Sequence, residues 1–169
     1  EMQTGLPQTG LLYPAAYIVN DQQSIELLSF DAAPAAGGAG PACLMSWGDK
    51  GAAVTMRGAT VGWGTGFARI REAVQPGTVA KWRVKLSSEG RRNVHRVGVV
   101  TPRVSLDAEN CDQAGVWLFQ NSPYHYVNGE MDQLSGKTLF EGGDTVELEL
   151  DRTAHTLIIH NPSSGATEM

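Results

Sequence analysis

The chain has 169 residues, of which 41% are hydrophobic and 18% are charged, a composition typical of one globular domain and not of a disordered segment. Its 13 Lys and Arg residues face 18 Asp and Glu residues, which gives a net charge of -5. This balance argues against a nucleic-acid partner, because phosphate contacts need a basic face. No apolar run approaches the roughly 20 residues of a membrane-spanning helix, so we expect no membrane partner either.

Cysteine is used sparingly, at Cys43 and Cys111. Neither residue has a partner at the spacing of a zinc site or a redox motif, and two cysteines are far fewer than a disulfide framework needs. The sequence Asn161-Pro162-Ser163 is not a glycosylation site, because proline occupies its middle position. We therefore expect an intracellular protein with two buried thiols, and pairing of the two cysteines is the alternative.

Short apolar runs separated by 20 glycines and 8 prolines are typical of an all-β protein. In residues 81–86 and 145–150, apolar residues alternate with polar ones, as in strands with one buried face. No stretch shows sustained helical periodicity. The predicted strands are residues 12–19, 24–30, 53–57, 67–70, 79–87, 95–100, 115–119, 124–127, 145–150 and 156–160.

Turn signals separate several of these strands. Asn128-Gly129 follows an aromatic run and predicts a hairpin turn. Residues 151–154 link two strong strands and predict a second hairpin, and Gln75-Pro76-Gly77 predicts a tight turn.

One segment has a biased composition. Residues 31–41 are rich in Ala, Gly and Pro, which favours a flexible linker. This linker would separate an N-terminal arm, residues 1–30, from a main body, residues 42–169. The two parts together would make one domain.

Five passages of the body stand out together, namely residues 79–84, 96–102, 115–129, 141–151 and 156–161. No single passage is specific, but in their order and spacing they resemble a SPRY domain.

The resemblance breaks down at the end of the chain. In the family, closing strands follow the last hairpin, whereas here residues 6–17 and 23–30 are similar to those strands. The arm would then carry the closing strands of the sandwich. A circular permutation, a cut through a tandem array or strand exchange between chains, as in a homodimer, would each explain this order. We predict that residues 11–30 pair with the body, and an ordinary N-terminal β-hairpin is the alternative.

The resemblance implies a bent antiparallel β-sandwich of the concanavalin-like jelly-roll type. It also implies a scaffold or a substrate receptor of a ubiquitin ligase, which holds a protein or peptide partner in loops at one end of the sandwich. Trp63, which lies between two glycines, suits either an exposed contact or a cap on the core. The other site residues implied by the family are Asn20, Asp21, Arg57, Gly58, Thr60, Pro102, Arg103, Asp107 and Asn110.

The sequence carries only weak signals of catalysis, metal binding or cofactor binding. The four histidines lack metal-ligand spacing, and residues 62–66 lack the Lys-Ser/Thr pair of a phosphate-binding loop. The acidic residues around Cys111 do not have the spacing of an EF-hand. We therefore expect no catalytic residues, metal or cofactor. The alternatives are a lectin-like sandwich, a hydrolase that uses Asp107 and Glu109, and a structural module that exchanges strands.

Overall fold

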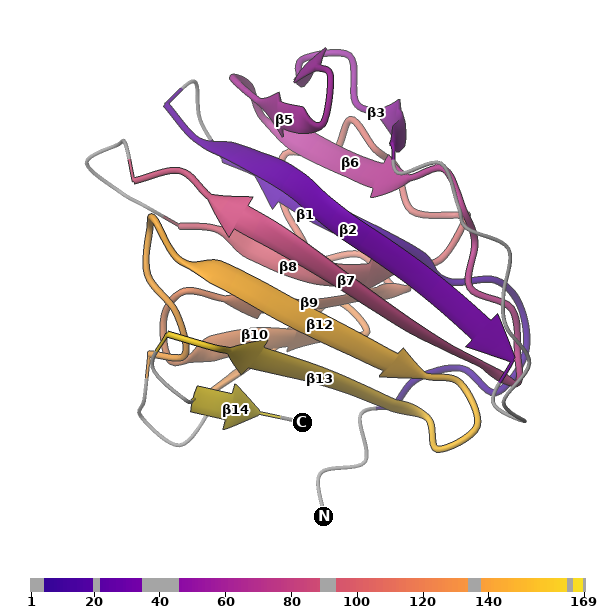
Figure 1. Ribbon diagram of the computed structural model, residues 1–169. Helices are drawn as coiled ribbons and strands as arrows, with labels where there is room; N and C mark the ends of the chain where they lie inside the picture. The colour runs from indigo at the N-terminus through magenta and orange to yellow at the C-terminus, as the bar shows by residue number, and fades with distance from the viewer. Residues whose placement is uncertain are drawn as a thin grey trace.

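The computed structural model describes residues 5–19, 22–34, 46–88, 94–133, 138–163 and 166–168. These residues form fourteen strands in two antiparallel sheets that pack face to face (Figure 1). The first sheet, here the β1 sheet, contains β1 (Tyr13–Ile18), β3 (Trp47–Lys50), β6 (Gly66–Ile70), β8 (Arg96–Val100), β9 (Val116–Gln120), β10 (Tyr124–Val127) and β11 (Glu130–Gln133). The β2 sheet contains β2 (Ser24–Pro34), β4 (Thr55–Arg57), β5 (Thr60–Gly62), β7 (Thr78–Leu86), β12 (Thr145–Asp151), β13 (Thr156–Asn161) and β14 (Ala166–Glu168).

Both sheets have seven strands. The order in the β1 sheet is β11-β10-β9-β8-β1-β6-β3, and the order in the β2 sheet is β14-β13-β12-β7-β2-β5-β4. The predicted all-β antiparallel sandwich is therefore confirmed. Each predicted strand also coincides with an observed one, whereas β3, β5, β11 and β14 were not predicted. These four strands have three or four residues each, which is too short to show an alternating pattern.

The arm strands occupy central places, one in each sheet. β1 lies between β8 and β6, so that Ala16 is opposite both Val97 and Ala68. β2 lies between β7 and β5, and Phe30 is opposite Trp82. The predicted pairing of residues 11–30 with the body is therefore confirmed, and it occurs within one chain. The alternative of an N-terminal hairpin is wrong, because β1 and β2 belong to different sheets.

The predicted linker begins too early. Residues 31–34 continue β2, with Asp31 opposite Lys81 and Pro34 opposite Thr78. The long strand β7 offers backbone partners along this stretch, and this pairing outweighs the weak strand propensity of alanine and proline. The rest of the predicted linker, residues 35–41, lies outside the described residues.

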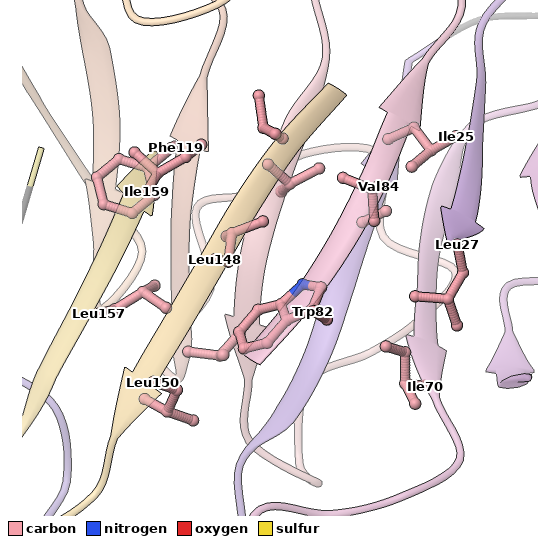
Figure 2. Packing of buried hydrophobic residues seen from close by; sticks show 14 of the residues in the cluster. Ile25, Leu27, Ile70, Trp82, Val84, Phe119, Leu148, Leu150, Leu157 and Ile159 are labelled. Carbon is pink, nitrogen blue, oxygen red and sulfur yellow. The ribbon is translucent and has the colours of Figure 1, made fainter. Parts of the chain in front are cut away.

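The main core fills the space between the two sheets. Alternation along β7 turns Trp82, Val84 and Leu86 inward and leaves Arg83 and Lys85 between them exposed. Figure 2 shows Trp82 among side chains of β2, β12 and β13, with Ile70 and Phe119 contributed by the β1 sheet. Full burial of each such side chain contributes about 2–3 kcal/mol, so this interface supplies most of the stability of the sandwich.

A second core covers the outer face of the β1 sheet. Residues 101–115, which connect β8 to β9 and are here called the β8–β9 loop, lie across that face. The loop contributes Val104 and Cys111, which pack with Tyr17, Phe67 and Leu118 of the sheet. Because the β1 sheet is covered on both faces, β1 and β9 are buried almost throughout and lack polar alternation.

The N-terminal segment is held at one end of the sandwich by a buried cation. Arg152, in the turn between β12 and β13, is 2% exposed. Its guanidinium donates to the carbonyl oxygens of Pro7, Gly10 and Val74 at 3.0–3.1 Å. Burial lowers the pKa of Arg152, and the carbonyl oxygens take over the role of solvent.

Candidate partner-binding surface

The short β4–β5 ribbon brings two predicted site residues into contact. Arg57 is opposite Thr60, and Gly58 turns the chain between them with a φ of 60°. The Cζ atom of Arg57 lies 4.7 Å from the centroid of the Trp63 ring. A cation over an aromatic ring at an exposed site contributes about 0.5–1 kcal/mol. The exposed Arg57 side chain therefore lies over the half-buried ring of Trp63.

Trp63 is held in place by its own backbone. Its φ of 53° is uncommon for a bulky residue, and its N–H donates to the carbonyl oxygen of Gln23 at 3.0 Å. The glycines on either side are required by close packing. A Cβ at Gly62 would lie 2.3 Å from the Gln23 oxygen, and one at Gly64 would lie 1.8 Å from the Ala53 oxygen. The glycine-rich run is thus a tight loop between packed backbones.

The same loop is tied to the turn that follows β1. The Thr65 hydroxyl donates to the carbonyl oxygen of Val19 at 2.9 Å, and the Gln23 side chain accepts from the Val19 N–H at 3.2 Å. The predicted site residues Asn20 and Asp21 lie outside the described residues. Val19 and Gln23, which precede and follow them in the sequence, both contact the loop that carries Trp63.

Asp107 has a partner within the chain. Its Oδ1 atom accepts from the backbone N–H of Ala52, in the turn between β3 and β4. The neighbouring Leu106 carbonyl accepts from the Phe67 N–H at 2.8 Å. These bonds fix the middle of the β8–β9 loop beside the turn against which Gly64 packs.

The structure does not bring Pro102 and Arg103 to this surface. Pro102 and Arg103 follow the end of β8 that is paired with Tyr13, whereas Trp63 precedes the end of β6 that is paired with Ile18. The expectation that all predicted loops meet at one end of the sandwich is therefore not met by these two residues. Asn110 is exposed and accepts from the N–H of Asp112 at 3.4 Å, as in a local turn.

Sequence reasoning missed a cluster on the outer face of the β1 sheet. Arg96 lies between two aromatic rings, with its Cζ 5.2 Å from the Tyr17 centroid and 5.4 Å from that of Tyr126. Its Nε donates to the side chain of Gln120 at 2.7 Å. Burial raises the pKa of Tyr17 and of Cys111 to about 12. Both groups therefore stay protonated at neutral pH, and the thiol is a poor nucleophile.

Sequence reasoning also missed Met56, which lies on the β4–β5 ribbon. It lies beside Arg57 on β4, the edge strand of the β2 sheet, and it is one of the few large apolar side chains that are exposed. Its position on a short edge strand gave no signal in the sequence pattern. Because successive residues of a strand point to opposite faces, Met56 and Arg57 lie on different faces of the ribbon. Arg57, Gly58, Thr60 and Trp63 together are here called the Arg57–Trp63 surface.

Among the described residues, no group of three or more His, Cys, Asp or Glu side chains could hold a metal ion. In the same part of the chain, no helix is long and apolar enough to cross a membrane. Comparisons with protein-family models, with curated proteins and with solved structures found no match to this chain.

Proposed function

We propose that the chain is a non-enzymatic protein-recognition domain that binds a segment of a partner protein at the Arg57–Trp63 surface. The observation that carries the proposal is the position of the exposed Arg57 guanidinium, whose Cζ lies 4.7 Å from the centroid of the half-buried Trp63 ring. Tryptophan and arginine are residue types that interface hot spots favour, and here the two side chains are in contact.

The rigidity of the surface also supports the proposal. The bond from the Trp63 N–H to Gln23 and the packing of Gly64 against Ala53 set the backbone before any partner arrives. A preformed surface loses little conformational entropy on binding, so more of the contact energy appears as affinity.

The chemistry of the surface indicates the partner. The Arg57 guanidinium is exposed and carries several N–H donors, while its flat face is occupied by the Trp63 ring. Its free edge suits a carboxylate or a side-chain amide. The partner segment would therefore be acidic or rich in Asn and Gln.

The same proposal extends to the kind of assembly in which the domain acts and to its location in the cell. The segments that resemble a SPRY domain suggest a scaffold, or a receptor that recruits substrates to a ubiquitin ligase. An intracellular location agrees with a free, buried thiol at Cys111.

The test is an affinity pull-down read by quantitative mass spectrometry, followed by titration of the purified partner. The variants are Arg57→Ala and Trp63→Asn, because asparagine tolerates the positive φ of this position. Arg83→Ala, on the exposed face of β7, is the matched control. We expect one partner to bind each variant about 30-fold more weakly, as is typical of an interface hot spot, and to bind the control normally. Identical protein lists for wild type and both variants would overturn the proposal.

A further inference from the structure

The strand β11 forms one edge of the β1 sheet, on the opposite side of the sandwich from the Arg57–Trp63 surface. All four of its residues, Glu130–Gln133, are exposed. Within the described ranges, β11 pairs with β10 on one side only. Its other side offers backbone N–H and C=O groups that could bond to a further strand.

One face of this edge carries two exposed large side chains, Met131 and Tyr124, beside Gln133. Met131 is opposite Tyr126, and Tyr124 is opposite Gln133, so these side chains point to the same face of the sheet. Met131 is 59% exposed and Tyr124 is 37% exposed. Methionine and tyrosine are side chains that interfaces favour, and the pair lies diagonally across the two outermost strands.

The other face of the edge is acidic. Glu130 and Asp132 alternate with Met131 along β11 and therefore point away from it. Both carboxylates are exposed. The strand thus presents Met131 and Gln133, beside Tyr124 of β10, on one face and two carboxylates on the other.

We propose that the β11 edge binds an extended segment of another protein as an additional strand, in which apolar residues alternate with Lys or Arg. The apolar residues would lie beside Met131 and Tyr124, and the basic residues would lie opposite Glu130 and Asp132. A slip of one residue would exchange the two rows, so the alternating pattern also selects the register. This proposal does not rest on the one made for the Arg57–Trp63 surface.

A second copy of the chain fits this edge poorly. If two β11 strands paired antiparallel with their Met131 rows on the same face, acidic residues would oppose each other. Glu130 would lie opposite Asp132, or Asp132 would lie opposite its counterpart. Like charges directly opposite one another destabilise a strand pair, so a basic segment from a different protein is the better occupant.

The test uses the full chain and two synthetic peptides of about eight residues, one alternating valine with lysine and the other alternating valine with glutamate. Backbone amide NMR signals and hydrogen exchange report binding. With the lysine peptide, we expect shifts and slowed exchange centred on β11, and an affinity at least about tenfold higher than that for the glutamate peptide.

A charge reversal makes the result specific. The double variant Glu130→Lys/Asp132→Lys should bind the glutamate peptide more tightly than the lysine peptide. A misfolded chain could not acquire this new preference. The control Glu109→Lys/Glu141→Lys makes the same change in net charge at exposed loop positions and should keep the original preference.

Three results would overturn the proposal. The first is that neither peptide affects the β11 amides, and the second is that the reversed variant still prefers the lysine peptide. The third is that the β11 amides become protected when the concentration of the protein alone is raised, because a second copy would then be the occupant.

Discussion

The Nε2 atom of His95 lies 3.3 Å from the hydroxyl oxygen of Ser87, at a place where the imidazole is 1% exposed. The Ser87 oxygen also accepts from the backbone N–H of Ser24, at the start of β2. The backbone of His95 exchanges hydrogen bonds with Asn121, which follows β9. One buried histidine thus connects loops of both sheets.

This histidine should make the protein sensitive to acid. Burial lowers the pKa of His95 from 6.5 to about 4, so the imidazole is neutral in the folded state. Below pH 6.5 the unfolded chain takes up a proton that the folded chain does not, and stability falls until the pH reaches about 4. The expected loss is about 3 kcal/mol.

Urea unfolding of wild type and His95→Gln between pH 7 and pH 4 would measure this effect, since the variant should lose less stability across that window. His160→Gln, at a half-buried position of β13, is the control for replacing a histidine elsewhere in the sandwich. If the unfolding free energy fell equally with pH for wild type and for His95→Gln, His95 would not be the source of the acid sensitivity.

The buried guanidinium of Arg152 gives a second prediction. Arg152→Met keeps much of the side-chain volume but leaves the carbonyl oxygens of Pro7, Gly10 and Val74 without this donor. We expect a loss of about 3 kcal/mol in unfolding free energy, because each buried unsatisfied group is costly. The amides of Leu12 and Val74, which bond to each other's carbonyl groups, should also exchange faster.

Arg83→Met is the control for this change. Arg83 is exposed on β7, so its substitution should alter stability by less than about 0.5 kcal/mol. If the two variants were equally stable, Arg152 would not hold the N-terminal segment.

Two glycines beside the Arg57–Trp63 surface should respond differently to alanine. A Cβ at Gly64 would lie 1.8 Å from the backbone oxygen of Ala53, so Gly64→Ala must displace the loop and should cost more than about 2 kcal/mol. Gly58 has a φ of 60° and open space around it, so Gly58→Ala should cost only about 1 kcal/mol of backbone strain. Thermal unfolding of both variants measures the difference, and a smaller cost at Gly64 would contradict the observed packing.

The thiol of Cys111 should be inert in the folded protein. Burial raises its pKa to about 12, and the β8–β9 loop covers it. Iodoacetamide at pH 8 should modify Cys111 at least about 100-fold faster in urea than in the native state. Peptide-level mass spectrometry separates this signal from that of Cys43. Similar rates in both states would mean that the loop opens readily.

The sequence predicted the candidate site less completely than it predicted the strands. Arg57, Gly58 and Thr60 lie together on the β4–β5 ribbon, and Arg57 contacts Trp63, which was singled out for its flanking glycines. Pro102 and Arg103 do not, because the β8–β9 loop begins at the other end of β8. The exposed Met131 and Tyr124 gave no sequence signal, since an edge position depends on which strands pair.

The sequence by itself determined which segments become long strands, because alternation of side chains with a period of two is a local property. Residues 81–86 and 145–150 carry that alternation, and they lie within β7 and β12. Only the tertiary structure decided that β1 joins β8 and β6, that residues 31–34 extend β2, and that Arg57 meets Trp63. These outcomes depend on backbone pairing and side-chain contacts with distant or non-adjacent residues, whose geometry exists only after the two sheets have packed.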